Sequence, residues 1–208
     1  MTAERDVTGE TTLASQSNAA AGDRFGTAVS VHDQVMVVGA PHHDDERGAA
    51  YFYGQPYNRG HQTEWNQVAI VTAASAPGGR QLGDRFGRSV DNYRGNVIVG
   101  APLRDLNTFG ALEKSNAGAA FIFRPRITNS FAPYRVYAGF GAGDRQENDR
   151  FGRGVAIGSL FWLIGAPRAD IGAGIQPIQI NPGTGILLNH TDRGAIRRGP
   201  YRTLNWYW

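Results

Sequence analysis

The sequence contains no cysteine among its 208 residues, which excludes disulfide bonds and metal sites built on thiolates. Packing alone must therefore stabilise the fold. No apolar stretch approaches the length that a bilayer-spanning helix needs. The amino terminus also lacks the basic start and apolar stretch that mark a secretory signal. We therefore expect a chain without a membrane span whose stability comes from its core.

Lysine is almost absent as well. The basic side chains are 20 arginines and the single Lys114, with a formal net charge of +3 and a pI near 9.4. Arginine forms bidentate hydrogen bonds with carboxylates and stacks on aromatic rings, so the preference for arginine over lysine is typical of surfaces rich in ion pairs or interfaces. A cluster near the carboxyl end comprises Arg193, Arg197, Arg198 and Arg202, beside aromatic residues. A protein interface or a solvated face is favoured there over nucleic acid.

Catalytic signatures are missing too. The sequence has no Gly-x-Ser-x-Gly elbow, no cysteine nucleophile and no zinc-type histidine pair on a helix. Single carboxylates such as Asp91 and Glu113 are present, but nothing pairs them as general acid and base. We therefore expect a protein that is not an enzyme, and we treat a hydrolase as the weakest alternative.

Glycine is abundant, and much of it belongs to an internal repeat. A Phe-Gly pair is followed by Gly-Ala-Pro three times, each time with 14 residues from the phenylalanine to the first glycine of the triplet. The copies comprise Phe25, Gly26, Gly39, Ala40 and Pro41; Phe86, Gly87, Gly100, Ala101 and Pro102; and Phe151, Gly152, Gly165, Ala166 and Pro167. The phenylalanines lie 61 and 65 positions apart, and an Asp-Arg pair precedes each of them. One structural unit therefore recurs with loops of varying length.

Two apolar segments, separated by a short polar or glycine-containing break, follow each Phe-Gly pair. In the first copy they cover residues 28–31 and 35–38, and the second segment recurs at 97–99 and 161–164. Short runs rich in β-branched and aromatic residues predict the two strands of a hairpin. Because the second strand is apolar at successive positions, we expect neighbours to cover both of its faces.

Two further segments complete each copy. A third segment, which begins with glycine, lies at 48–53, at 118–123 and, more loosely, at 183–188. A fourth lies at 65–71, 134–138 and 201–206. Four strands in about 60 residues are typical of a propeller blade.

These motifs, in a fixed register from about residue 11 to the carboxyl end, resemble the FG-GAP repeat family, the blades of integrin α-subunit-type β-propellers. The resemblance implies an all-β fold of three four-stranded FG-GAP blades. Closed propellers use about four to eight blades, so we expect a partial, open propeller that oligomerisation would complete. We assign residues 1–16 to an amino-terminal arm with an extra strand, and the three blades to 17–77, 78–140 and 141–208, the last with an aromatic carboxyl terminus.

The motif residues have mechanical roles in this scheme. Glycines such as Gly39 let two backbones approach closely, and Pro41 and its counterparts end a strand because proline has no amide hydrogen to donate. Phe25, Phe86 and Phe151 are then expected to pack between neighbouring blades. We interpret the whole motif as architectural rather than catalytic.

Both ends of the sequence carry candidate interface residues. Residues 10–15 resemble the last strand of a preceding blade, so Leu13 is a candidate for pairing with a neighbouring subunit by strand addition. At the other end, Tyr201, Trp206 and Trp208 are candidate anchors. The alternative for Trp206 is a place in the last strand of its own blade. Two copies could form a six-bladed ring, or the open blade face could dock on another protein of a larger particle.

Integrin-type propellers commonly hold calcium in a loop of the form Asp-x-Asp-x-Asp-Gly, and this sequence departs from that pattern. Asp44, Asp45 and Asp105 follow Gly-Ala-Pro triplets and are the only weak candidates for ligands. Calcium takes six to eight oxygen ligands, and no loop supplies such a set. We therefore expect no cofactor and no metal site at these aspartates.

The resulting functional prediction is a non-catalytic protein-interaction or structural module of adhesion or scaffold type, a homo-oligomer or a subunit of a larger particle. The resemblance implies an extracellular, cell-surface or virion-surface location. The alternative is a glycan-binding, lectin-like module, with Tyr57, Trp65 and Tyr93 as candidate aromatic contacts.

Overall fold

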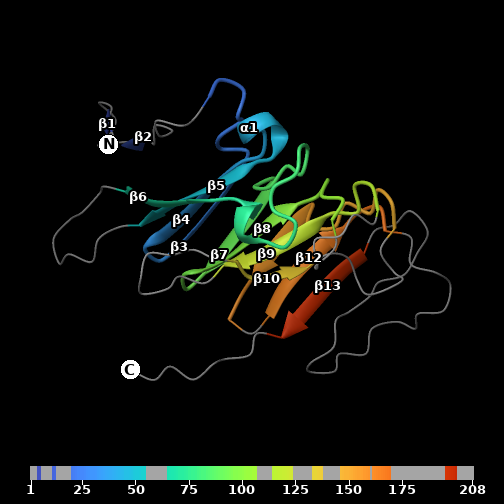
Figure 1. Cartoon of the computed structure of the whole chain (residues 1–208). Coiled ribbons are helices and arrows are strands. Elements are labelled where there is room, and N and C mark those ends of the chain that lie inside the picture. The colour runs from blue at the N-terminus through green and yellow to red at the C-terminus, as the bar shows by residue number, and fades with distance from the viewer. Residues whose placement is uncertain are drawn as a thin grey trace.

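The computed structural model describes five stretches of the chain with their side chains, and the backbone of four further strands. These are residues 20–54, 65–106, 114–123, 146–159 and 161–169, and the strands Glu4–Arg5, Thr11–Thr12, Pro133–Tyr137 and Ala195–Pro200. Antiparallel sheets dominate the described part (Figure 1). The all-β class that the sequence predicts is confirmed.

The first sheet has four antiparallel strands in the order β3-β4-β5-β6. They are β3 (Ala28–His32), β4 (Val35–Ala40), β5 (Ala49–Gly54) and β6 (Asn66–Val71). Asp33 in the turn between β3 and β4 has a φ of 53°, the left-handed conformation that tight hairpins need. The strand β4 ends directly before Pro41, as expected of a residue without an amide hydrogen.

The loop between β4 and β5 contains one tight turn, α1 (His43–Glu46). Asp44, Asp45 and Glu46 have φ values of 51°, 53° and 60°, so this turn is left-handed and not a regular α-helix. A 3-10 turn, η1 (Ala73–Ser75), follows β6, and the Thr72 hydroxyl accepts a hydrogen bond from the Ala74 amide there.

The second sheet repeats the first with the order β7-β8-β9-β10. Its strands are β7 (Ser89–Tyr93), β8 (Asn96–Ala101), β9 (Ala119–Phe123) and β10 (Pro133–Tyr137). The registers also agree, because Ala40 pairs with Ala49 in the first sheet and Ala101 pairs with Ala119 in the second. The hairpins and the third and fourth strands predicted for these two copies are confirmed.

The third sheet has three strands in the described part of the chain, β11 (Gly154–Ile157), β12 (Phe161–Ala166) and β13 (Ala195–Pro200). Strand β12 lies between β11 and β13, so β13 takes the third place in this sheet. The third strand predicted at 183–188 lies outside the described residues. Ala166 pairs with Ala195, the same register as in the other sheets. The fourth strand predicted at 201–206 lies outside the described residues.

At the amino-terminal end, β1 (Glu4–Arg5) and β2 (Thr11–Thr12) pair with each other in a small two-stranded sheet. The extra strand expected in residues 10–15 is therefore present at Thr11–Thr12. Its partner in the described backbone is β1.

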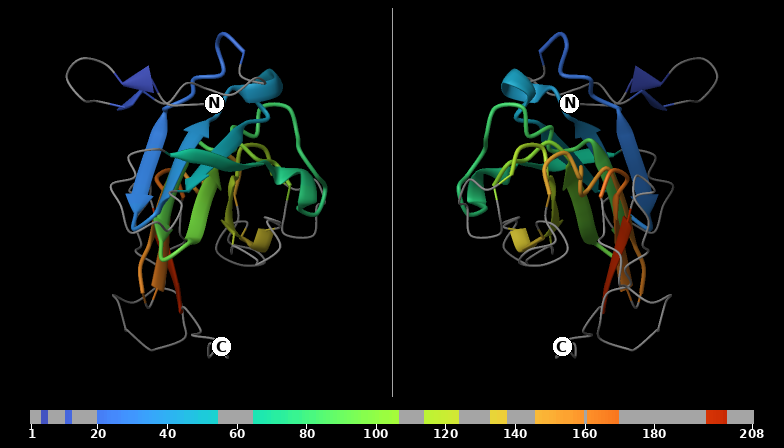
Figure 2. Two further views of the ribbon diagram at one scale, coloured as in Figure 1. Left: turned by 90° about the vertical axis from the view of Figure 1, so that its left-hand side faces the viewer. Right: turned by 90° about the vertical axis from the view of Figure 1, so that its right-hand side faces the viewer.

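The sheets lie side by side in chain order, from the first sheet at the upper left of Figure 1 to the third at the lower right. The two turned views show that the sheets fan out from one another (Figure 2). The first strands of the repeats, β3, β7 and β11, are neighbours, because hydrogen bonds join Ser30 to Asp91 and Asp91 to Ile157.

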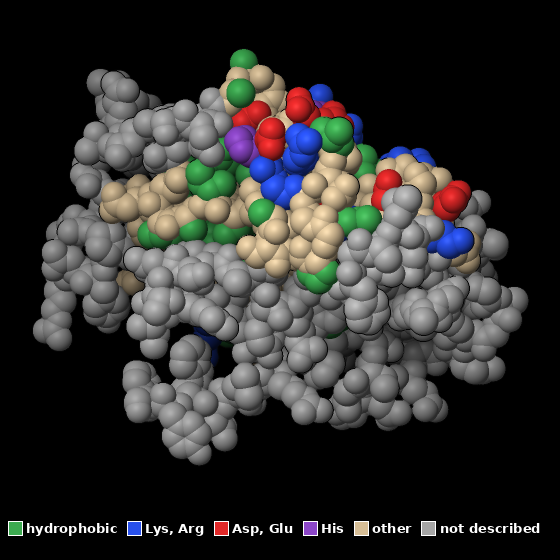
Figure 3. Space-filling view, viewed as in Figure 1, with side chains coloured by type: hydrophobic (Ala, Val, Ile, Leu, Met, Phe, Trp, Pro, Cys, Tyr) green, Lys and Arg blue, Asp and Glu red, His purple; other side chains and the backbone are tan. Residues whose placement is uncertain are grey.

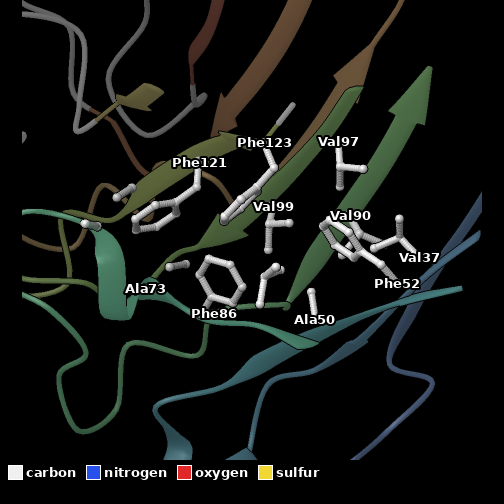
Figure 4. Packing of buried hydrophobic residues seen from close by; sticks show 14 residues of the cluster. Val37, Ala50, Phe52, Ala73, Phe86, Val90, Val97, Val99, Phe121 and Phe123 are labelled. Atoms are coloured by element: carbon white, nitrogen blue, oxygen red, sulfur yellow. The ribbon is translucent and has the colours of Figure 1, made fainter. Parts of the chain in front are cut away.

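The hydrophobic core lies between the sheets. One cluster joins the first and second sheets and contains Phe52, Phe86, Phe121 and Phe123, whose rings meet edge to face (Figure 4). A second cluster joins the second and third sheets and contains Ile98, Phe151 and Trp162. Strand β8 is consequently covered on both faces, as predicted. In β4, Val37 packs toward the second sheet, and Val38 and Ala40 on the other face are buried in a third cluster with Tyr51 and Tyr53.

Candidate functional site

The Asp-Arg-Phe-Gly turn has the same geometry in all three repeats. Each aspartate is buried and accepts a hydrogen bond from the backbone amide three residues earlier, at 2.7–3.0 Å. The arginine and the glycine have left-handed φ values, near 55° and 88° respectively, at Arg24 and Gly26, Arg85 and Gly87, and Arg150 and Gly152. The same left-handed arginine and glycine thus flank the phenylalanine in every copy of the turn.

The Phe-Gly pair attaches each repeat to the repeat before it. The backbone of Phe86 pairs in parallel with Gly48 and donates its amide hydrogen to the carbonyl of Arg47 at 3.2 Å. One repeat later, Phe151 pairs with Gly118 and donates to the carbonyl of Ala117 at 2.9 Å. Both phenylalanines are fully buried, so the expectation that they pack between neighbouring sheets is met at these two positions.

The glycines of the Gly-Ala-Pro triplets lie at the closest approach of two sheets. A Cβ atom on Gly39 would collide with the carbonyl oxygen of Gly87, and one on Gly100 would collide with that of Gly152. Glycine is needed here because any side chain would force the sheets apart. Gly39 and Gly100 thus each meet the Phe-Gly glycine of the following repeat.

One carboxylate joins the inner strands of all three sheets. Asp91 Oδ1 accepts hydrogen bonds from the Ser30 hydroxyl at 2.7 Å and the Asn92 amide at 2.9 Å, and Oδ2 accepts from the Ile157 amide at 2.8 Å. The buried Asn92 side chain also donates to the carbonyl of Val35 at 3.1 Å. In the sequence, Asp91 is an isolated carboxylate. In the structure, its hydrogen bonds connect the neighbouring strands β3, β7 and β11.

A bidentate ion pair adds to the contact between the first two sheets. The Arg85 guanidinium donates from Nε and Nη2 to the Glu46 carboxylate at 2.9–3.1 Å. Hydrogen bonding to Arg85 is the main reason that the pKa of Glu46 is lowered. Acidic and basic side chains gather on this side of the molecule, around α1 in the upper part of Figure 3.

The face of the first sheet that points away from the second sheet is the candidate functional site. We call it the outer face, and it comprises Phe25, Val29, Val31, Met36, Val38, Tyr51, Tyr53 and Ile70. The equivalent face of the second sheet, which includes Phe86, Val90, Phe121 and Phe123, is buried against the first sheet. The outer face therefore has the composition of an interface between sheets.

The two faces differ in exposure along their first strands, whereas Val38, Tyr51 and Tyr53 in the middle of the outer face are buried. Val90 is 9% exposed, whereas its repeat equivalent Val29 is 65% exposed and Val31 is 62% exposed. Phe25 is half-buried and contacts Tyr51 edge to face at 5.2 Å. Exposed valines beside aromatic rings make an apolar patch, which on a protein surface marks a contact site.

Two tyrosines distinguish the outer face from its counterpart. Tyr51 and Tyr53 occupy the places of Phe121 and Phe123 and are buried. Their hydroxyls have no hydrogen-bond partner in the described part of the chain. Burial raises the pKa of Tyr53 to about 12, and Tyr51 adds to the shift.

The third sheet presents the complementary half of the same kind of interface. A Cβ on Gly165 would lie 3.6 Å from the Gly154 carbonyl oxygen, an ordinary contact, and no residue of another sheet approaches it among the described residues. Phe161 is 38% exposed, and β12 alternates between buried and accessible positions. The expectation that the second strand is covered on both faces is therefore wrong for β12.

The end residues proposed from the sequence, Leu13, Tyr201, Trp206 and Trp208, lie outside the described residues. Sequence analysis did not select Val29 and Val31, although their alternation with Ala28 and Ser30 is the period-2 signal of a two-faced strand. That signal identifies the apolar face of β3 but not its exposure, which depends on the neighbouring sheet.

The aspartates considered as weak calcium ligands make other contacts. Asp44 pairs with Arg80 at 2.8 Å, Asp45 lies 3.5 Å from Arg47, and Asp105 accepts the Asn116 amide at 2.7 Å. No group of three or more histidine or carboxylate side chains gathers among the described residues. The absence of a metal site stays a prediction.

The candidate glycan contacts do not form one site in the described part. Trp65 packs at the edge of the outer face. Tyr93 is the last residue of β7, where His32 contacts its ring at 4.5 Å and Arg94 lies over it at 5.5 Å. Tyr57 lies outside the described residues.

Comparison with known proteins identifies the repeat. The FG-GAP repeat profile matches residues 9–53 and 65–123, which include the first sheet and the strands β7, β8 and β9 of the second. A search of curated proteins finds no significant match. Among the described residues, no helix is long and apolar enough to cross a membrane.

Proposed function

The chain belongs to the FG-GAP repeat family, and from this premise we propose that it is a non-catalytic protein-interaction module, an open segment of a β-propeller that works as a subunit of a larger assembly. The outer face of the first sheet is its contact surface. The repeat family supports protein as the partner, and an extracellular, cell-surface or virion-surface location accompanies the proposal.

The observation that carries the proposal is the difference between equivalent valines. Val90 is buried against a neighbouring sheet, while Val29 is 65% exposed on a face of the same composition. Burying apolar area is worth about 25 cal/mol per Å², so covering the exposed valines of this face with a fitting surface is favourable. The chain itself contains such a surface, because the second sheet presents one to the third.

A second copy of this chain is the proposed partner. The outer face offers the Phe-Gly half of the contact between sheets, and the third sheet offers the Gly-Ala-Pro half around Gly165. Two different patches that fit each other form a heterologous contact, which gives a ring if the rotation closes. Two copies would then supply six sheets.

Light scattering coupled to size exclusion tests this proposal. The wild type is expected to show a mass above that of the monomer at micromolar concentration, and the double variant Val29→Asp/Val31→Asp is expected to be monomeric because charges on the face oppose its burial. Leu82→Asp is the control, since Leu82 is 66% exposed but lies outside this face. A monomeric wild type, or a double variant with unchanged mass, would overturn the proposal.

A further inference from the structure

A basic cavity opens where the Asp-Arg-Phe-Gly turns of the three sheets converge. Its volume is about 230 Å³, and five arginines line it: Arg24, Arg85, Arg88, Arg150 and Arg153. It is separate from the outer face of the first sheet. Its size is below the range of about 300–1,000 Å³ that is typical of pockets for drug-sized ligands, so it suits a small polar group.

The repeat explains why so many arginines meet here. Arg24, Arg85 and Arg150 are the same position of three successive turns, each held with a left-handed φ. Arg88 and Arg153 share the position that follows Phe-Gly, where the first copy has Thr27. Because the inner strands β3, β7 and β11 are neighbours, their turns lie at one end of the sheets and bring equivalent side chains together.

The positive charge of the cavity is largely uncompensated. Arg85 pairs with Glu46, whereas no ion pair to Arg24, Arg88, Arg150 or Arg153 is present in the described part of the chain. The Nε of Arg150 is buried without a hydrogen-bond partner. Burial, followed by the charges of Arg153, Arg85 and Arg24, lowers the pKa of Arg88, as expected where like charges crowd.

The remaining walls narrow the chemistry of the ligand. They include Pro41, Pro102, Leu103 and His42. The pKa of His42 is lowered, first by burial and then by the charge of Arg24. Among the described residues, the lining contains no phenylalanine, tyrosine or tryptophan, so the cavity lacks the large rings on which single-stranded nucleic-acid bases usually stack. Guanidinium groups with aliphatic walls suit a carboxylate carried on a peptide chain.

We infer that this cavity binds carboxylate side chains of an acidic protein segment, with Arg88, Arg150 and Arg153 as the donors. Each guanidinium offers a planar pair of N–H groups that matches a carboxylate. Binding at this place would use residues from the second and third sheets together and would therefore depend on their packing.

Fluorescence anisotropy with a labelled oligoaspartate peptide tests the inference on the full chain. The wild type is expected to bind, and its affinity should fall as ionic strength rises. The double variant Arg88→Gln/Arg153→Gln should weaken binding at least about tenfold, because two charge-assisted hydrogen bonds are lost. Arg153→Gln alone, at an exposed side chain, gives a second reading if the double variant melts at a lower temperature.

The matched control is Arg94→Gln/Lys114→Gln, which removes the same charge from exposed side chains outside the cavity and should change affinity less than about twofold. Equal effects of the two double variants would overturn the inference, and so would a wild type that binds inorganic phosphate, a heparin fragment or single-stranded DNA but not oligoaspartate. Self-association does not enter this readout, so the cavity and the outer face can fail separately.

Discussion

At the scale of single residues, the repeat glycines differ in what surrounds them. Gly39 contacts the following sheet, where an added Cβ would collide with the Gly87 carbonyl oxygen. At the equivalent Gly165, an added Cβ would lie 3.6 Å from the Gly154 carbonyl oxygen, which is an ordinary contact. Gly39→Ala should therefore destabilise the fold by about 1–3 kcal/mol or more, because the two sheets must move apart.

Gly165→Ala is the matched control for this prediction and should change the free energy of unfolding by less than about 0.5 kcal/mol in the isolated chain. Urea unfolding of both variants measures the difference. Similar losses at the two positions would show that the close approach of the sheets is not what requires glycine at position 39.

The Tyr53 hydroxyl is buried without a partner in the described part of the chain. Tyr53→Phe should raise the melting temperature, because an unsatisfied buried polar group costs about 1–3 kcal/mol. The fit of a phenylalanine ring is shown by Phe123, the equivalent residue of the second sheet. Calorimetry at neutral pH checks this expectation, and a lower melting temperature would contradict it.

The same substitution should alter stability at alkaline pH. Because the pKa of Tyr53 is about 12 in the fold and about 10 when unfolded, the folded state keeps a proton that the unfolded state releases. Stability is therefore fully present below pH 10 and is lost as pH rises toward 12. Tyr53→Phe should reduce this loss by about 2–3 kcal/mol, as measured by unfolding at a series of pH values.

At the scale of elements, Asp91 of β7 links this strand to β3 and β11 by accepting hydrogen bonds from Ser30 at 2.7 Å and Ile157 at 2.8 Å. Asp91→Asn keeps one acceptor oxygen and replaces the other with a donor, which would face either the Ser30 hydroxyl or the Ile157 amide. The expected cost is about 1–3 kcal/mol for the donor left without a partner. Hydrogen exchange at the Ile157 amide should become faster.

Asp33→Asn serves as the control for Asp91→Asn. It removes one negative charge from an exposed turn whose left-handed φ of 53° asparagine tolerates. Stability should change by less than about 0.5 kcal/mol. If both variants unfold alike, the loss at Asp91 is a charge effect and not the loss of the junction.

Most strands could be predicted from the sequence, because their signals are local. The spacing of Phe-Gly and Gly-Ala-Pro fixes the turns before and after each hairpin, and the β-branched runs between them match β3, β4, β8 and β12. The left-handed turn at α1 was missed, since Asp44, Asp45 and Glu46 in a row carry no glycine that signals positive φ.

The strand β13 could not be predicted for a different reason. The Gly-Thr-Gly start and apolar end of residues 183–188 predict a strand there, whereas the strands β5 and β9 both begin with alanine after glycine. The dipeptide Gly194-Ala195 has that pattern and leads into β13. Because Arg197 and Arg198 are polar, this strand lacks the run of apolar residues that predicts the other strands.

At the scale of the whole molecule, the candidate site could not be predicted because it depends on which sheet has a neighbour. Val29 and Val90 read alike in the sequence, and so do Phe25 and Phe86. Their exposures differ only through the packing of sheets. The arginine cavity has the same origin, since its residues are spread over three repeats and meet only in the folded chain.

Two phenylalanines at the same repeat position test this dependence on neighbours. Phe86 is fully buried between two sheets, so Phe86→Ala should destabilise the fold by about 3–5 kcal/mol. Phe25 is half-buried on the outer face, so Phe25→Ala should cost less than about 2 kcal/mol in a monomeric chain, where only part of its ring is removed from water.

Association of two copies should increase the destabilisation caused by Phe25→Ala but not that caused by Phe86→Ala. If a second copy covers the outer face, Phe25→Ala removes apolar area from the contact and raises the dissociation constant, so the gap between the two variants narrows as protein concentration increases. Thermal unfolding over a range of concentrations measures this gap. A gap that stays constant while the wild type is oligomeric would place the contact between copies on another part of the molecule.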